Sequence, residues 1–105
     1  HGLVSWILAK EKFNIDDKEV LEAMRWHTTG KENMSTLDKI IYIADMIEPS
    51  RTYDGVEEIR QKVLENLDEG LLMGMDHTIK YLLSREQLID LNTVKARNYL
   101  ILNKA

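Results

Sequence analysis

The clearest structural signal in the chain is the segment STLDKIIYIADMIEPSR, residues 35–51. Ser35 and Asp38 have the spacing of a capping box at a helix N-terminus, with Asp in the position usually held by Glu. Apolar residues then follow almost without interruption up to Ile47, and Pro49 disfavours helical geometry in the residue before it. The segment therefore predicts a helix that begins after Ser35 and ends before Pro49.

The rest of the chain shows the same helical periodicity. Apolar residues recur at spacings of three and four, strand-type alternation is absent, and only one Pro and five Gly interrupt the pattern. Besides the helix above, we expect helices from His1 to about Phe13, from a cap at Asp16 or Asp17 to about Trp26, around Val56, Ile59 and Val63, over 67–83, and from a cap at Asn92 or Thr93 to Leu102. The expected inward faces are Val20, Leu21, Met24 and Trp26 in the second helix and Leu71, Leu72, Met75, Ile79, Leu82 and Leu83 in the fifth. The sequence thus predicts an all-α fold, a bundle of about six helices.

Length and composition set the broad class. A chain of 105 residues fits one domain, so we expect residues 1–105 to form a single domain. The formal net charge of -4 gives no basic field for nucleic acid, and no apolar run approaches the roughly 20 residues of a membrane span. The chain has no Cys, which excludes thiolate metal sites and Cys nucleophiles and fits a cytoplasmic location. Any metal site must therefore use His and carboxylate ligands.

Three residues are candidate metal ligands: His1, His27 and Asp45. Each is predicted on a helix or at its end, and neutral imidazole with carboxylate suits Zn, Mn or Fe. Their spacing alone is weak evidence, because no His-x-x-x-His or His-Glu-x-x-His pair places two ligands on adjacent turns of one helix. Asp45 lies in an almost continuous apolar segment, where an acid is either paired or metal-bound. A capped or salt-bridged Asp at the exposed edge of the helix is an equally good interpretation.

The residues after His27 form a candidate phosphate site. Thr28, Thr29, Gly30 and Lys31 offer hydroxyls, backbone N–H groups and a cation within one short loop. A simple Gly-terminated helix, with His27 favourable to the helix dipole, explains the same residues. On the residues alone, this second interpretation is the better one.

Three segments resemble the signature stretches of the YqeK-type HD-domain family: 25–30 (RWHTTG), 38–51 (DKIIYIADMIEPSR) and 95–100 (KARNYL). The similarity runs in register along essentially the whole chain. This resemblance implies an all-α HD domain with a dinuclear metal centre, typically iron or a similar ion. It also implies hydrolysis of symmetrical dinucleoside tetraphosphates, such as diadenosine tetraphosphate to two ADP, and a homodimer.

By position, the resemblance implies that His1, His27 and Asp45 are metal ligands, with the two histidines on one metal and Asp45 on the other. The family bridges its two metals with the Asp of a His-Asp dyad, and no His-Asp dipeptide occurs in this chain. We therefore expect the chain to be the C-terminal portion of the domain, with an earlier His and the dyad ahead of residue 1. The alternative is a remnant that cannot assemble the two metals.

The resemblance also implies a mechanism. Two metals would lower the pKa of a bridging water, hold the resulting hydroxide against a phosphorus and offset charge on the phosphate oxygens. Arg51 follows the Asp45 helix in the matched segment, where its guanidinium can fold back and clamp phosphate. We therefore expect Asp45 and Arg51 to be catalytic and Arg51 to bind substrate together with residues 28–31. Lys39 is a weaker phosphate candidate.

The remaining His and the aromatic residues receive no role in the chemistry. His77 lies outside the matched segments and is expected to be structural or exposed. Trp6, Trp26, Tyr42 and Tyr81 can stack on a nucleobase, but aromatic residues at helical spacing more often belong to the core. No base pocket is therefore assigned from the sequence.

Two other functions stay open. A noncatalytic helical module would bind another protein through its acidic surface or apolar grooves, and would carry no metal. A different HD phosphohydrolase would act on another nucleotide or on a cyclic substrate, since a fold does not fix its substrate. Only the His-Thr-Thr-Gly and Ala-Asp-x-Ile-Glu-Pro contexts favour the tetraphosphates.

Overall fold

The computed structural model describes residues 17–104, which form α-helices joined by turns and contain no strand. The helices are α2 (Asp17–Arg25), α3 (Thr36–Ile47), α4 (Val56–Glu65), α5 (Leu67–Ser84) and α6 (Leu91–Leu102). This result confirms the predicted all-α fold. The helix predicted over residues 1–13 lies outside the described residues.

The central helix begins and ends where its sequence predicts. The Asp38 backbone N–H donates to Ser35 Oγ at 3.1 Å, and the Ser35 backbone N–H donates to Asp38 Oδ2 at 2.8 Å, so both halves of the capping box form. At the other end, Glu48 has an extended backbone with ψ of 153°, as the residue before Pro49 requires. These local signals therefore fix both ends of α3.

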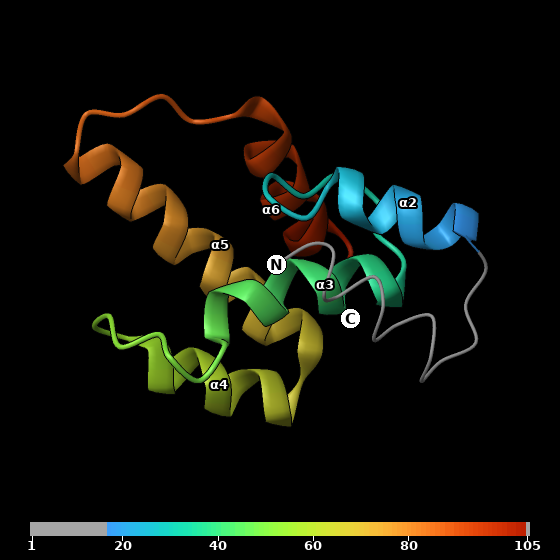
Figure 1. Cartoon of the computed structure of the whole chain (residues 1–105). Helices are drawn as coiled ribbons and strands as arrows, with labels where there is room; N and C mark the ends of the chain where they lie inside the picture. The colour runs from blue at the N-terminus through green and yellow to red at the C-terminus, as the bar shows by residue number, and fades with distance from the viewer. Residues whose placement is uncertain (1–16, 105) are drawn as a thin grey trace.

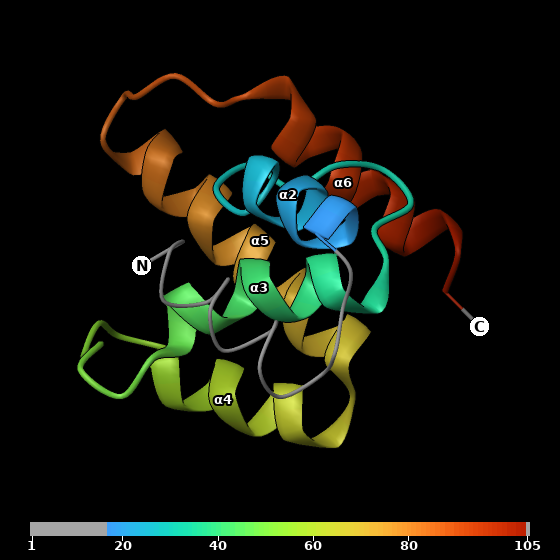
Figure 2. The ribbon, with the colours of Figure 1, turned by 45° about the vertical axis from the view of Figure 1, so that its right-hand side comes forward.

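Helix α3 lies between α2 on one side and α4 on the other, as both views show (Figures 1 and 2). It contacts α2, α4 and α5, while the long α5 also packs against α4 and α6. Glycine permits the close approach of α5, because a Cβ at Gly74 would lie 2.8 Å from Met46 Sδ and 2.9 Å from Ile43 Cδ1. Helices α3 and α5 are therefore in direct contact.

The core lies where α3, α4, α5 and α6 meet. Its members are mostly apolar and have almost no exposed surface: Tyr42, Ile43, Ile59, Leu71, Met75 and Ala96, with Met34 from the loop before α3. Complete burial of a side chain such as Leu71 contributes about 2 to 3 kcal/mol. This packing gives the site a rigid base.

Three details of the predicted helices are wrong. Leu21 is 64% exposed and Ala23 is buried instead, because successive residues on a helix are about 100° apart and Leu21 therefore lies nearly opposite Ala23. Leu83 is 63% exposed, since the C-terminal end of α5 projects beyond its neighbours (Figures 1 and 2). The cap of α6 is Asp90, whose side chain accepts from the Asn92 N–H, rather than Asn92 or Thr93.

None of the helices in residues 17–104 is both long and apolar enough to cross a membrane.

Candidate functional site

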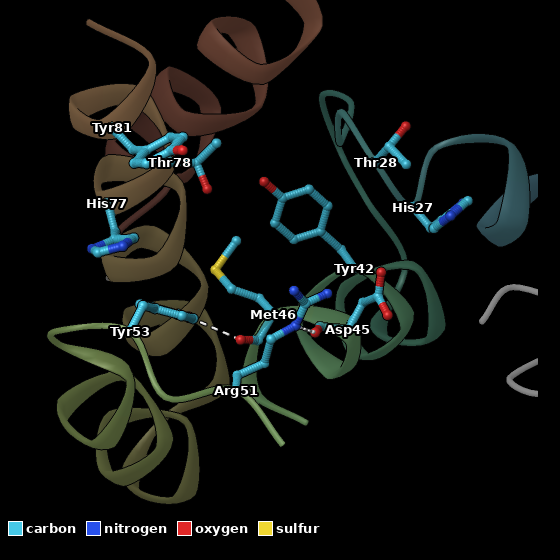
Figure 3. A pocket seen from close by; sticks show the side chains of 10 residues that line it. All are labelled: His27, Thr28, Tyr42, Asp45, Met46, Arg51, Tyr53, His77, Thr78 and Tyr81. Carbon is cyan, nitrogen blue, oxygen red and sulfur yellow. Dashed lines mark hydrogen bonds between the residues drawn. The ribbon is translucent and has the colours of Figure 1, made fainter. Parts of the chain in front are cut away.

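A pocket of about 510 Å³ lies between α3, α5, the turn after α2 and the loop after α3. Figure 3 shows the side chains that line it: His27, Thr28, Tyr42, Asp45, Met46, Arg51, Tyr53, His77, Thr78 and Tyr81. Four residues of the predicted site, from three separate segments of the chain, are among them. The pocket is therefore the candidate active site.

His27 lies in the turn that follows α2, and its ring is half-buried. Its Nδ1 lies 2.5 Å from the Met24 carbonyl oxygen, a group that only accepts hydrogen bonds. Nδ1 is therefore the protonated nitrogen, and the lone pair of Nε2 is available to a metal ion or a proton. This arrangement is the usual one for a histidine that binds a metal through Nε2.

Asp45 lies on the last turns of α3 and is half-buried in the wall of the pocket. In the view of Figure 3, its carboxylate lies at the same end of the pocket as His27 and Thr28, whereas His77 and Tyr81 lie at the other end. Of the α3 residues that line the pocket, Asp45 is the one acid, beside Tyr42 and Met46. An anionic oxygen and an imidazole nitrogen at one end of the pocket form a donor set suited to a divalent transition metal.

Arg51 returns to the end of the helix that carries Asp45. Its Nε donates to the backbone carbonyl of Asp45 at 3.2 Å, and it forms an ion pair of 3.8 Å with Glu48. The side chain is about half exposed, and it lines the pocket (Figure 3). The predicted fold-back of the guanidinium is therefore present, and its remaining N–H groups are in reach of a ligand in the pocket.

The residues that hold this loop in place carry no signal in the sequence. Arg60 Nε donates to the Ile47 carbonyl at 2.9 Å, and its Nη2 donates to the carbonyls of Glu48 at 2.8 Å and Arg51 at 2.9 Å. The Tyr53 hydroxyl donates to the Met46 carbonyl at 2.8 Å. The last carbonyls of a helix have no partner within the helix, and these side chains supply the donors. The loop that carries Arg51 is thus fixed by one guanidinium and one phenol.

The other residues of the predicted phosphate loop have contacts outside the pocket. Gly30 is buried with a φ of 77°, and its N–H donates to the Trp26 carbonyl at 2.8 Å. The Thr29 hydroxyl donates to the Gly30 carbonyl at 3.0 Å, while the Thr29 carbonyl accepts from the buried Thr93 hydroxyl at 2.8 Å. Of the residues 28–31, the structure brings only Thr28 to the pocket. Thr29 and Gly30 shape the turn that presents it.

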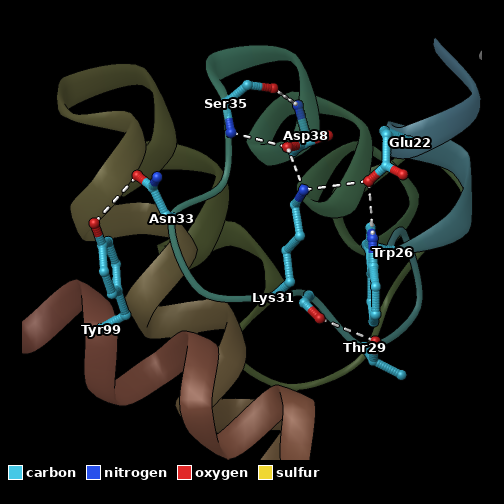
Figure 4. A network of polar contacts seen from close by, with 9 residues as sticks. Glu22, Trp26, Thr29, Lys31, Asn33, Ser35, Asp38 and Tyr99 are labelled. Carbon is cyan, nitrogen blue, oxygen red and sulfur yellow. Dashed lines mark hydrogen bonds and ion pairs between the residues drawn. The ribbon is translucent and has the colours of Figure 1, made fainter. Parts of the chain in front are cut away.

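Lys31 does not line the pocket and lies in a polar network with Glu22 and Asp38 (Figure 4). Its ammonium pairs with Glu22 at 3.4 Å and with Asp38 at 3.9 Å. The hydrogen bond from Lys31, with a second from the Trp26 indole, holds the pKa of the Glu22 carboxyl below its ordinary value. Lys39 likewise pairs with Asp68 at 2.7 Å. Both cations thus have carboxylate partners, and neither lines the pocket.

His77, which received no role from the sequence, is half-buried and lines the pocket. Its ring packs against that of Tyr53 with centroids 4.8 Å apart and planes at 33°. Tyr42, which also lines the pocket, has only 3% of its surface exposed, and burial raises the pKa of its phenol to about 12. Tyr42 is therefore a core residue with a neutral phenol at physiological pH, and it is the most buried residue that lines the pocket.

The predicted metal site is described only in part. His1 lies outside the described residues. Within residues 17–104, no group of three or more His, Cys, Asp or Glu side chains is arranged to hold a metal ion. The structure therefore places two of the three predicted ligands, His27 and Asp45, in the wall of one pocket, and their role as ligands stays a prediction.

Comparison with known proteins gives consistent results. No protein-family model matches the chain. It is 41% identical over 95 residues, 90% of its length, to a protein of Halalkalibacterium halodurans named symmetrical bis(5'-nucleosyl)-tetraphosphatase, of which it covers 51%. A Bacillus subtilis protein of the same name is 33% identical over 101 residues, which are 96% of this chain and 54% of that protein.

One solved structure matches over almost the whole chain. It is a predicted HD superfamily hydrolase involved in NAD metabolism from Clostridium acetobutylicum, with 52% identity and a TM-score of 0.82. The match covers 99% of this chain and 55% of that one. The chain thus spans about half the length of the proteins it matches.

Proposed function

We propose that this chain, which resembles the YqeK-type HD family and is similar to the tetraphosphatases and the HD hydrolase above, forms part of a metal-dependent phosphohydrolase. The proposed enzyme cleaves symmetrical dinucleoside tetraphosphates, with diadenosine tetraphosphate giving two ADP. The relatives in Halalkalibacterium halodurans and Bacillus subtilis carry the name of that activity over about twice the length of this chain. The proposal therefore concerns the whole protein to which these residues belong. The lack of Cys in the 105 residues supports a reducing compartment, the cytoplasm, as its location.

One observation supports this proposal most directly. His27, Asp45 and Arg51, which come from the turn after α2, from α3 and from the loop after α3, line a single pocket. Such convergence of an imidazole, a carboxylate and a guanidinium is what metal-dependent phosphoryl transfer uses. A noncatalytic helical module would not need it.

We assign His1 and Nε2 of His27 to one metal of a dinuclear centre and the carboxylate of Asp45 to the other. The orientation of His27 supports this assignment, because its Nδ1 is engaged by the Met24 carbonyl. When bound, a divalent transition metal lowers the pKa of water and offsets charge on a phosphoryl oxygen. Iron is our first choice, with manganese and zinc as alternatives that the same ligands allow.

The remaining polar residues of the pocket act on the phosphates. Arg51 is held by the Asp45 carbonyl through Nε, which leaves its terminal N–H groups to donate to phosphate oxygens in a fork. Thr28 offers a hydroxyl at the same end of the pocket. Thr29 and Gly30 contribute by fixing the turn, and Lys31 contributes through its ion pairs rather than by contact with substrate.

The test uses protein expressed from the complete reading frame. We expect stoichiometric iron, manganese or zinc by elemental analysis, and release of ADP from diadenosine tetraphosphate. His27→Ala and Asp45→Ala should lose both the metal and the turnover, whereas Arg51→Met should keep the metal and raise KM.

The matched control is Asp54→Asn, an exposed acid that does not line the pocket. It should retain metal and activity. Unchanged turnover in His27→Ala and Asp45→Ala would contradict the proposal. A folded, metal-free protein without phosphohydrolase activity would favour the noncatalytic module instead.

A further inference from the structure

The end of the pocket away from His27 and Asp45 is lined by aromatic rings. Tyr53 enters from the loop after α3, while His77 and Tyr81 enter from α5 (Figure 3). Residues four apart on a helix lie on the same face, so the two rings of α5 follow one another along the wall. The Tyr53 ring packs against the first of them with a centroid distance of 4.8 Å. Three rings thus line this end of the pocket, and we name them the aromatic wall.

The rings of the aromatic wall are more exposed than a core ring. Tyr42, which is one, has 3% of its surface exposed, whereas Tyr81 has 50% and the other two rings are half-buried. The Tyr53 hydroxyl is already used by the Met46 carbonyl, and the Arg85 guanidinium lies 5.5 Å from the centroid of the Tyr81 ring. These contacts fix the orientation of the rings and leave ring surface directed at the pocket. A ligand that covers such exposed aromatic surface removes it from water, which favours binding.

The pocket is larger than a bound metal ion and one phosphate group would fill. Its volume of about 510 Å³ is that of a site for a whole small molecule, and a phosphate at Arg51 would fill only part of it. In the view of Figure 3, the Arg51 side chain lies between the two ends. A ligand whose phosphates contact Arg51 therefore has its other end beside the aromatic wall.

We infer that Tyr53, His77 and Tyr81 form the nucleobase subsite of this pocket, on which one base of the substrate stacks while its phosphates contact Arg51. The inference rests on the proposed function and adds to it the residues that recognise the nucleoside. Stacking needs only the π face of a base and therefore tolerates different bases. The subsite should accordingly favour nucleotides over inorganic phosphates without strong discrimination between adenine and guanine.

The experiment compares two probes that share a diphosphate group, ADP and inorganic pyrophosphate. Their affinities for the full-length, metal-loaded protein are measured by isothermal titration calorimetry. In Tyr81→Ala and His77→Ala, ADP should bind about 10-fold more weakly, whereas pyrophosphate should bind as before. Tyr81→Phe and His77→Phe keep a ring and should retain most of the affinity for ADP. Tyr99→Ala removes a ring from α6 outside the pocket and should change neither probe.

The outcomes separate this inference from the proposed function. If the variants bind ADP as tightly as the parent, or lose ADP and pyrophosphate equally, the aromatic wall is not the base subsite, even where hydrolysis is intact. If the alanine variants lose ADP selectively and the phenylalanine variants recover it, the subsite stands even where no hydrolysis is found. Unchanged thermal unfolding of each variant shows that the binding result is local.

Discussion

The two segments that bring His27 and Arg51 to the pocket are held in different ways. The turn 26–31 is fixed by packing, because Gly30 is buried against α5 and α6. The loop 48–53 is mostly exposed and is fixed by hydrogen bonds from Arg60 and Tyr53 to carbonyls of the helix end. Packing tolerates no change in volume, whereas a set of hydrogen bonds can be weakened one at a time. The two ends of the site should therefore respond differently to mutation.

The largest effect is expected from Gly30→Ala. A Cβ at this position would lie 2.9 Å from Met75 Cε and 3.2 Å from Ala96 Cβ, and the φ of 77° is unfavourable for any residue with a side chain. Together, overpacking and backbone strain should lower the free energy of unfolding by about 3 kcal/mol. Urea denaturation measures this change.

The matched control for that variant is Gly55→Ala. Its φ of 95° is also positive, but the added Cβ would meet only the His77 ring, at 3.7 Å. It should therefore cost only the backbone term, about 1 kcal/mol. Equal losses in the two variants would mean that packing does not hold the turn 26–31.

The second-largest effect is expected from Arg60→Met, which removes hydrogen bonds that hold the loop 48–53. It removes the donors to three carbonyls while keeping most of the side-chain volume. Because those carbonyls lie near solvent, the free energy of unfolding should fall by only about 2 kcal/mol. The affinity for pyrophosphate should fall as well, since Arg51 loses the support of its loop.

An arginine with a different set of contacts provides the control. Arg97→Met removes an ion pair of 2.9 Å with Asp76, with both side chains more than a third exposed. Such a pair contributes about 0 to 1 kcal/mol, and its loss should leave pyrophosphate binding unchanged. In Arg60→Met combined with Arg51→Met, binding should be no weaker than in Arg51→Met alone. A further loss would show that Arg60 does not act through Arg51.

Local signals explain which parts of the fold and site were predictable. The capping box at Ser35 and the stop before Pro49 lie within the helix they define, so the sequence predicted both ends of α3. His27, Asp45 and Arg51 were identified through short matched segments, and the structure brings them to one pocket. Their chemical roles stay predictions, because a pocket lined by the expected residues is not a bound metal or substrate.

The supporting residues were not predictable, because they act across the sequence. Arg60 donates to carbonyls 9 to 13 residues away, and Thr93 donates to a carbonyl 64 residues away. Nothing in the local pattern of either residue indicates which carbonyl it reaches. His77 had no matching motif, and only the packing of α5 against the loop after α3 places it in the pocket. Sequence periodicity predicts helices better than it predicts these tertiary hydrogen bonds.

The third effect concerns Tyr42, the most buried residue that lines the pocket. Burial raises the pKa of its phenol from 10.0 to about 12, because the charged phenolate is disfavoured in the core. Its contribution to stability is fully present below pH 10, the range of the unfolded phenol, and is lost as the pH rises towards 12. By pH 11 the loss should be about 1 kcal/mol. Tyr42→Phe should show a smaller loss between pH 9 and 11 in urea denaturation, and parallel curves for the two proteins would contradict the assignment.

The smallest effect is expected from Thr93→Val, which removes the one side-chain hydrogen bond that the turn 26–31 receives from α6. The Thr93 side chain is buried, with 4% of the residue exposed, and its hydroxyl donates to the Thr29 carbonyl at 2.8 Å. Val keeps the shape and leaves that carbonyl without its donor, so the free energy of unfolding should fall by about 1 kcal/mol. Thr93→Ser restores the donor but removes a methyl group, so it should bind ADP and pyrophosphate as the parent does even where stability stays reduced. If Thr93→Val changes ligand affinity as much as Arg60→Met does, hydrogen bonds rather than packing position His27, and the two segments are held in the same way.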